Sequence, residues 1–399
     1  MSKKGKTILH IDLDCFFVSV ERVLNPALNS KPVIVSGKPD SRGVVSSASY
    51  EARAFGVKNG MPLTKALKLC PDAIVLPINK TAYAHFSEQV FNLLRRFSPF
   101  VEEASIDEAY IDLTGMVERY GSARKAGEII QREIKTRLAL PCSVGIGSNK
   151  LIAKIASKLA KPEGIVEVAF GAEKEFIAEL PINILPGVGG KTEERLRLLG
   201  AKKVKHIVSL GQDLLITHFG KLGIYIYRSA LGKGESKLNI EGEPPKSLSK
   251  EITFDQDIFD PEEKEQWIYL LILKLGMKLR EWGLYAQRLT LKFRSPDFTT
   301  WTRTTRLKSA TNNDQTLFFY ARKILQREDK PNQPLRLLGV SAGELCSTCQ
   351  LDLFESEKWE KQNKLLKALD ELRKDFGLDI IYPARIRKLM EKINKGEAK

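Results

Sequence analysis

The sequence lacks any apolar run approaching the roughly 20 residues that span a bilayer, so a membrane protein is not expected. It has only five cysteines. Cys15, Cys70 and Cys142 stand singly among apolar neighbours, and the lone C-x-x-C pair, Cys346 and Cys349, has no second pair or histidine nearby to complete a zinc site. The N-terminus has lysines but no signal-peptide apolar core or cleavage site. We therefore expect a cytoplasmic protein with reduced thiols.

Acidic residues are few relative to basic ones. The 399 residues include 64 Lys plus Arg against 49 Asp plus Glu, a net charge of +15. This excess favours a polyanionic partner, either nucleic acid or an acidic membrane surface. No strongly basic amphipathic helix supports the membrane option, so nucleic acid is favoured, with a merely basic protein as the alternative. The length is that of about two to four domains.

The first part of the chain alternates apolar strand patterns with helical spacing. We predict strands over residues 8–14, 32–37, 43–50, 105–113 and 142–147, and helices over 83–97, 122–138 and 149–161. The order predicts an α+β domain whose mostly antiparallel sheet carries helices on one face.

The pattern changes near residue 181. PINILPGVGGKTEERLRLLG reads as a glycine hairpin leading into a helix, and residues 218–232 repeat this pattern weakly. Residues 236–250 are poor in apolar residues and predict a tether. RLTLKFR (288–294) alternates apolar and basic residues, as a half-buried strand with one basic face does. Residues 355–391 are charged and helical.

Paired acids interrupt the strand pattern SIDEAYIDL (105–113). Asp107 and Glu108 are adjacent, so one should point inward, where an unpaired carboxylate is costly. If this strand pairs with the strand of Asp12, Asp12 and Asp107 converge at one sheet edge, with Glu108 at a turn or bulge beside them. Such acids suit two divalent cations, whose hard oxygen ligands indicate Mg²⁺, although acids capping exposed strand ends is the simpler interpretation.

Five motifs in order resemble the Y-family DNA polymerases of the translesion type, specifically the bacterial DNA polymerase IV branch, over residues 7–354: HIDLDCFFVSVE, SSASYEARAFGVKNGMP, SIDEAYIDL, SVGIGSNKLIAKIASKLAKPEG and LPGVGGKTEERLRLLG. The resemblance implies an α+β multidomain right-hand polymerase. Its implied parts are a palm with a mostly antiparallel sheet plus helices (1–18 and 77–170), fingers (19–76), a helical helix-hairpin-helix thumb (171–236), a linker (237–247), an α/β little finger (248–349), a sliding-clamp-binding peptide (350–354) and a charged helical tail (355–399).

The resemblance also implies the catalytic residues. Asp12, Asp107 and Glu108 would be the catalytic, metal-binding triad, with the main-chain oxygen of Leu13 as a further ligand for two Mg²⁺ ions per active site. Asp112 has no counterpart and is expected to be a surface or turn residue.

The residues implied to bind the nucleotide come from three segments. Tyr50, Arg53 and Lys161 would hold the triphosphate, which suits their phenol, guanidinium and ammonium donors. Phe17 would be the steric gate that excludes a ribose 2′-hydroxyl, although a lone Phe usually belongs to a core. The remaining contacts are backbone amides or hydroxyls at Cys15, Phe16 and Ser47.

DNA contacts are expected in two places. Gly187 and Gly189 of the hairpin would let the backbone approach a phosphate beside Lys191. The basic strand face follows at residues 288–308, where six Lys or Arg stand against one acid. Its implied DNA-binding residues are Arg288, Lys292, Arg294 and Arg306, and a solvated face is the alternative.

QLDLF resembles the peptide that docks bacterial replication proteins on the sliding clamp, through Gln350, Leu351, Leu353 and Phe354. The tail after it departs from the usual pattern, in which this peptide often ends the chain.

The function implied is that of a monomeric, low-fidelity translesion DNA polymerase. It would add deoxynucleoside triphosphates to primer-template DNA without a proofreading exonuclease and would depend on the clamp for processivity. Two alternatives remain: a palm-domain nucleotide cyclase, which needs neither hairpin thumb nor basic strand, and a catalytically inactive DNA-binding protein with the same fold.

Overall fold

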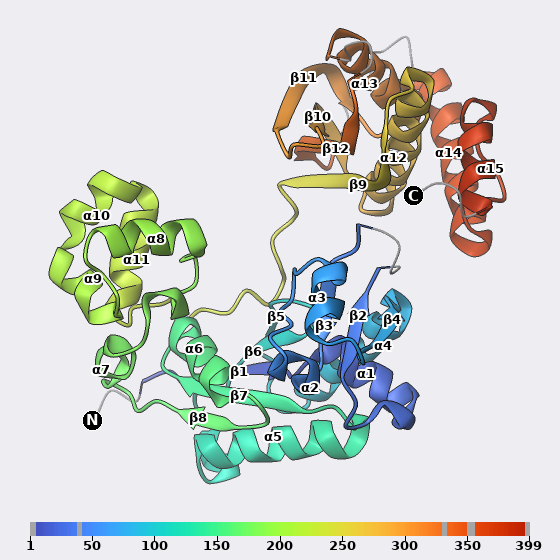
Figure 1. Cartoon of the computed structure of the whole chain (residues 1–399). Coiled ribbons are helices and arrows are strands. Elements are labelled where there is room, and N and C mark those ends of the chain that lie inside the picture. Colours follow the sequence, from blue (N-terminus) through green and yellow to red (C-terminus); the bar gives the residue numbers. More distant parts are fainter. Residues whose placement is uncertain (1–4, 38–41, 329–332, 349–355, 396–399) are drawn as a thin grey trace. The chain divides into compact units, whose positions relative to one another are not determined.

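The structure is a computed structural model, and it describes residues 5–37, 42–328, 333–348 and 356–395. The chain divides into two compact units, Met1–Glu243 and Pro244–Lys399 (Figure 1). The first contains two sheets and a helical segment, and the second contains one sheet with its helices.

The central sheet of the first unit has the strand order β5-β6-β1-β7-β8. Its strands are β1 (Ile8–Leu13), β5 (Val101–Glu103), β6 (Glu108–Asp112), β7 (Cys142–Gly147) and β8 (Ile165–Glu167). β1 is buried along its whole length and pairs antiparallel with both β6 and β7, whereas β7 and β8 are parallel. The predicted mostly antiparallel sheet is confirmed.

Helices cover both faces of this sheet, so the expectation of helices on one face was wrong (Figure 1). They are α4 (Lys80–Leu94), α5 (Ala123–Leu138) and α6 (Lys150–Ala160), with η2 (Val117–Tyr120) before α5. Leu9, Ile11 and Leu13 of β1 share a core with α4 and α5. On the opposite face His10 contacts Ser157 of α6.

A glycine explains why α6 can lie on that second face. A Cβ added at Gly145 of β7 would lie 2.0 Å from the carbonyl oxygen of Ala153 in α6. No other residue type permits this approach of helix to strand. Because α6 carries Lys154 and ends beside Lys161, the glycine also determines where these two cations lie.

A smaller sheet with the order β3-β2-β4 lies in the same unit. Its elements are β2 (Val33–Ser36), β3 (Val45–Ala48), β4 (Ile74–Pro77), α2 (Tyr50–Ala54) and α3 (Leu63–Leu69). Between β1 and β2 lie α1 (Phe16–Leu24) and the short η1 (Pro26–Leu28). Cys15, which precedes α1, adopts a left-handed conformation with φ of 47°.

The remainder of the first unit is helical. Its elements are α7 (Glu173–Ala178), η3 (Ile182–Ile184), α8 (Gly190–Leu198), α9 (Val204–Leu210), α10 (Gln212–Phe219) and α11 (Lys221–Ala230). Gly187 and Gly220 both have positive φ, at 84° and 57°, and each lies in the connection that leads into a helix. The weak repeat predicted over residues 218–232 is therefore a second glycine-hinged helix pair, α10 and α11.

The second unit is built on an antiparallel sheet with the order β11-β10-β12-β9. Its elements are β9 (Ser247–Ile258), α12 (Pro261–Glu281), β10 (Tyr285–Arg294), β11 (Thr300–Thr311), α13 (Asp314–Glu328) and β12 (Leu335–Cys346). Leu289, Leu291 and Phe293 of β10 are buried in one core with α12 and α13, which confirms the predicted alternation.

The predicted helical tail docks on this unit as α14 (Ser356–Phe376), η4 (Ala384–Ile386) and α15 (Arg387–Asn394). Ile386, Leu389 and Met390 join the core of the sheet and its helices. Arg280 of α12, whose side chain is 3% exposed, lies 2.8 Å from Asp314 and 2.5 Å from Asp370 of α14. The tail is thus held by apolar and charged contacts.

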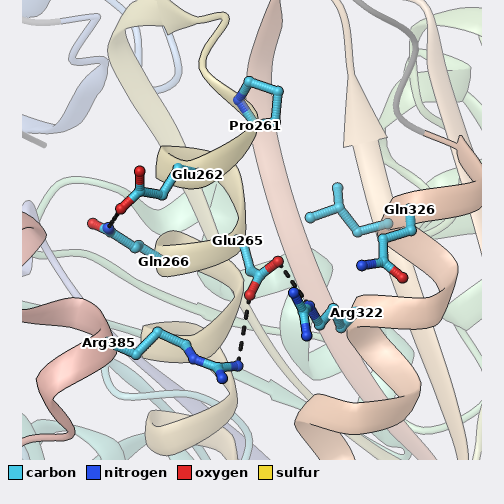
Figure 2. Close-up of a pocket in the computed structure, with 8 residues that line it drawn as sticks. Pro261, Glu262, Glu265, Gln266, Arg322, Gln326 and Arg385 are labelled. Carbon is cyan, nitrogen blue, oxygen red and sulfur yellow. Dashed lines mark hydrogen bonds and ion pairs between the residues drawn. The ribbon is translucent and has the colours of Figure 1, made fainter.

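A pocket lies where η4 meets α12 and α13 (Figure 2). The carboxylate of Glu265 lies 2.9 Å from Arg322 and 3.6 Å from Arg385 of η4. Glu265 thus forms ion pairs with both arginines, and its pair with Arg385 helps to hold the tail on this unit.

Candidate active site

The three predicted acids lie together at one end of the β1–β6 pair. Asp12 and Glu108 are cross-strand partners in register, and the Leu13 amide donates to the carbonyl of Asp107 at 2.9 Å. The backbone arrangement differs from the expectation, because β6 begins only at Glu108 and Asp107 lies in the bend before it. This bend allows adjacent acids to stand at one edge without a bulge in the strand.

Cations from one helix neutralise two of these acids. The Lys161 ammonium, just after α6, donates to Asp12 Oδ1 at 2.6 Å. Lys154, within α6, donates to Glu108. Asp107 instead accepts from its neighbour Ser105 at 2.6 Å. Two lysines therefore supply the positive charge that the adjacent acids require.

Asp12 is the most buried of the three acids. Burial raises the pKa of Asp12 from 3.8 to about 6, Lys161 opposes the rise, and Glu108 and Asp107 add to it. Such a site favours the binding of positive charge, because a cation offsets the cost of ionising a desolvated carboxylate.

The donor chemistry of this edge fits a hard divalent cation. Asp12, Asp107 and Glu108 offer carboxylate oxygens, and the backbone of Leu13 is hydrogen-bonded to that of Asp107. Among the residues that the structure describes, no three His, Cys, Asp or Glu side chains are already gathered around one ion position. In this structure the three acids are instead paired with Lys161, Lys154 and Ser105.

His10 belongs to the same site, and the sequence interpretation missed it. It is fully buried, its Nδ1 lies 2.7 Å from Ser157 Oγ, and its Nε2 lies 3.9 Å from Glu108 Oε2. Burial, then Lys154 and Lys161, lower its pKa to about 3, so the ring is neutral. The available signal was the strand alternation of ILHID, which places His10 on the same face as Asp12.

The predicted steric gate, Phe17, lies in α1 and is half-buried. Its ring stacks on that of Tyr83 at 4.3 Å between centroids, with the planes 9° apart. Tyr83 is held in turn by a 2.6 Å hydrogen bond to Glu21. Cys15 and Phe16, beside it, are buried, and burial raises the pKa of the Cys15 thiol.

Two of the predicted triphosphate-binding residues meet on one face of α2. The Arg53 guanidinium lies 5.1 Å from the centre of the Tyr50 ring, as the three-residue spacing predicted. The Tyr50 hydroxyl donates to Asp14 at 3.1 Å, and Arg53 Nε donates to the carbonyl of Ala48 at 3.0 Å. The hydroxyl-bearing Ser47 lies on β3 and is only 5% exposed.

The predicted DNA contacts fall in both units. Gly189 is the N-cap of α8, with the exposed Lys191 in its first turn. On β10 the basic face is partly neutralised: Lys292 lies 2.8 Å from Glu251 of β9, and Arg288 lies 3.2 Å from Glu344 of β12. Two further members of this face lie near a hydroxyl or an acid, with Arg294 at 2.8 Å from Thr300 and Arg306 at 3.6 Å from Glu344. The count over 288–308 missed both acids, because they come from strands distant in sequence.

Two sequence predictions lie wholly or partly outside the described residues: the clamp peptide, Gln350–Phe354, and Cys349 of the C-x-x-C pair. In the part of the chain that is described, no helix is long and apolar enough to cross a membrane.

Known proteins match the sequence of this chain over nearly its whole length. The impB/mucB/samB family profile matches residues 11–158, the IMS family HHH motif residues 171–201, and the impB/mucB/samB family C-terminal domain residues 245–353. DNA polymerase IV of Dehalococcoides mccartyi is 38% identical, covering 97% of this chain and 99% of that protein. DNA polymerase IV of Desulfatibacillum aliphaticivorans is 37% identical, with 95% and 96% covered.

Solved structures similar to this chain are also DNA polymerases. A Y-family DNA polymerase chimera is 29% identical, with a TM-score of 0.76 and coverage of 86% of this chain and 100% of that one. An insertion ternary complex of Dbh DNA polymerase is also 29% identical, with a TM-score of 0.60 and 84% and 98% covered. The fold is that of a right-hand DNA polymerase, as predicted. The chain belongs to the impB/mucB/samB family and is a Y-family DNA polymerase of the bacterial DNA polymerase IV type.

Proposed function

We propose that Asp12, Asp107 and Glu108 are the carboxylates with which this chain extends a primer. Family membership makes it a DNA-directed DNA polymerase of the translesion type, dependent on divalent metal, with DNA and deoxynucleoside triphosphates as partners. The supporting observation is the pairing of Asp12 with Glu108 in register beside Asp107, with Asp12 desolvated.

The three acids and the Leu13 carbonyl would hold two Mg²⁺ ions. A bound pair supplies activation of the primer 3′-hydroxyl and stabilisation of charge on the departing pyrophosphate. The protein's own contribution is to keep three carboxylates at one edge of the sheet. It also buries Asp12, which raises the pKa of this acid and favours a cation beside its ionised form. Lys161, now 2.6 Å from Asp12, would exchange that acid for a phosphate of the triphosphate when the nucleotide binds.

The nucleotide would lie over α1 and α2. Tyr50, Arg53 and Lys161 would contact its phosphates, together with Ser47 and the backbone of Cys15 and Phe16. Phe17, held flat against Tyr83, presents a rigid aromatic face where a ribose 2′-hydroxyl would need space.

Several further predictions remain beyond this site. The hairpin of Gly187, Gly189 and Lys191 and the basic face of β10 would track DNA phosphates independently of sequence. Residues 350–354 would dock on the sliding clamp, with the polymerase as a monomer. The division into palm, fingers, thumb and little finger at the expected boundaries, and a cytoplasmic location, also stay predictions.

A primer-extension assay with Mg²⁺ and four deoxynucleotides tests the carboxylate assignment. We expect distributive extension by the wild type and loss of about a hundredfold or more in Asp107→Ala, the scale of removing a group that stabilises transition-state charge. The matched control is Asp112→Ala, because Asp112 lies at the far end of β6 and pairs with Lys6 at 3.2 Å. Wild-type protein that binds DNA but extends nothing would support the inactive DNA-binding alternative instead.

A further inference from the structure

One buried carboxylate beside the active site has no part in the mechanism above. Asp14 follows β1, lies two residues from Asp12 and is 1% exposed. A buried carboxylate is tolerated only when donors satisfy both of its oxygens. The origin of its donors therefore reveals what this residue connects.

The donors of Asp14 come from three separate segments. The Tyr50 hydroxyl of α2 donates to Oδ1 at 3.1 Å. The Ser143 hydroxyl of β7 and the backbone amide of Glu163 each donate to Oδ2 at 2.9 Å. The Lys161 ammonium lies 3.9 Å from Oδ1. One carboxylate thus joins the start of α2 to the central sheet and to the segment after α6.

Two of these partners are the side chains assigned to the triphosphate. Tyr50 reaches it from the small-sheet part of the unit and Lys161 from the end of α6, so neither segment alone fixes their separation. Asp14 contacts the Tyr50 side chain directly, and through the Glu163 amide it holds the backbone two residues beyond Lys161. It therefore fixes both binding groups relative to β1.

Both oxygens of Asp14 act as acceptors in this role, because all three hydrogen bonds are donated to it. An asparagine at this position has one acceptor oxygen and would turn its NH₂ toward a donor on the other side. Asp14→Asn thus keeps the size of the side chain but removes at least one anchor and the charge that faces Lys161.

We propose that Asp14 is a positioning residue that holds Tyr50 and Lys161 at the separation the triphosphate requires before the nucleotide arrives. The inference rests on the proposed nucleotide site. It predicts that loss of Asp14 weakens nucleotide binding, while the chemical step at saturating nucleotide and the binding of DNA change little.

The test measures deoxynucleotide binding to enzyme on a primer that ends in a dideoxynucleotide, so that no turnover occurs. Single-turnover extension on a normal primer gives the maximal rate. Asp14→Asn should raise the nucleotide Kd about tenfold, the scale of a lost hydrogen bond to a charged group, and change the maximal rate less than about threefold. Asp112→Asn is the matched control, because that carboxylate also accepts from a lysine and a backbone amide in the same unit.

A double-mutant cycle separates positioning from general loosening. If Asp14 acts through Tyr50, Asp14→Asn combined with Tyr50→Phe raises the Kd by less than the product of the single effects. Multiplying effects, a normal Kd in Asp14→Asn, or an effect confined to the maximal rate would each overturn the inference.

Three single variants keep the outcome decisive. Tyr50→Phe and Lys161→Ala alone test the nucleotide site: a normal Kd in both means that the proposed function is wrong here, whereas a raised Kd in both with a normal Asp14→Asn rejects only Asp14. If Asp14→Asn does not fold, Ser143→Ala removes one anchor of the same carboxylate. We then expect a Kd raised about threefold, and an unchanged Kd overturns the inference.

Discussion

Some residues at the proposed active site lower the stability of the folded protein at neutral pH, and Asp12 shows this most clearly. Its pKa is raised from 3.8 to about 6, so the folded protein holds the Asp12 proton more tightly than the unfolded chain does. The contribution of this group to stability is therefore greatest below 3.8 and is lost as the pH rises through about 6.

Asp12→Asn should then stabilise the protein when no divalent cation is present. Above about pH 6 we expect a gain of about 2–3 kcal/mol in the free energy of unfolding, from a shift of about two pKa units, and a much smaller gain at about pH 4. Urea unfolding at the two pH values measures it. Excess Mg²⁺ should reduce the difference by stabilising only the wild type. An asparagine variant that is less stable than the wild type at the higher pH would contradict this.

The Phe17 ring gives the second prediction at this scale. Phe17→Ala removes the aromatic face but leaves Tyr83 held by Glu21, so the pocket should open without collapse. We expect the preference for deoxy- over ribonucleotides, measured as the ratio of kcat/KM values, to fall at least about tenfold. Phe100→Ala, at an exposed phenylalanine of the same unit, is the control. Unchanged discrimination would remove Phe17 from the gate.

The residues that the sequence suggested for the site and those that it did not suggest differ in a physical way. Asp107 and Glu108 are conspicuous because acids interrupt a strand pattern. Lys154, His10 and Asp14 are ordinary residues in their own segments. Their roles depend on contacts such as Lys154 with Glu108 or Asp14 with Ser143, which only the packing of α6 and β7 against β1 brings about.

At the scale of elements, the periodicity predicted most helices and strands but not which face each helix covers. The position of α6 on the second face of the sheet depends on Gly145, whose missing side chain carries no periodic signal. The start of β6 at Glu108 could likewise not be predicted, because Ile106, a strand-forming residue, lies in the bend before it. The docking of the tail could not be predicted, since its charged pattern also suits a free helix.

The docked tail leads to a prediction about buried charge. Arg280 is 3% exposed between Asp314 and Asp370, so Arg280→Met leaves Asp314 without its paired cation, while Asp370 keeps Arg373 at 3.7 Å. Breaking a buried pair from one side costs about 3–5 kcal/mol, and urea unfolding of the full chain should show this loss. Arg322→Met is the matched control, because its pair with Glu265 is 46% exposed at the arginine and is worth at most about 1 kcal/mol. Equal effects of the two variants would show that burial of Arg280 does not matter.

At the scale of the whole molecule, the net charge of +15 indicates a protein that binds a polyanion, yet part of that charge is internally compensated. Glu251 and Glu344 pair with Lys292, Arg288 and Arg306 on the face proposed to track DNA. Each acid competes with a phosphate for the same cation. If this face contacts DNA as proposed, these acids hold the affinity for DNA below what the basic residues alone would provide.

Replacing both acids, as Glu251→Gln with Glu344→Gln, should therefore strengthen DNA binding. Freeing about one to two cations should steepen the slope of log affinity against log salt by about 1–2 and raise affinity at low salt about tenfold. Fluorescence anisotropy over a salt series with primer-template DNA measures both. The control is Glu265→Gln, which frees Arg322 and Arg385 on the helical side of the sheet. If this control steepens the slope equally, general charge accounts for binding. If only the β10-face variant does, the basic strand contacts phosphate, because counterion release is counted only where phosphate and cation meet.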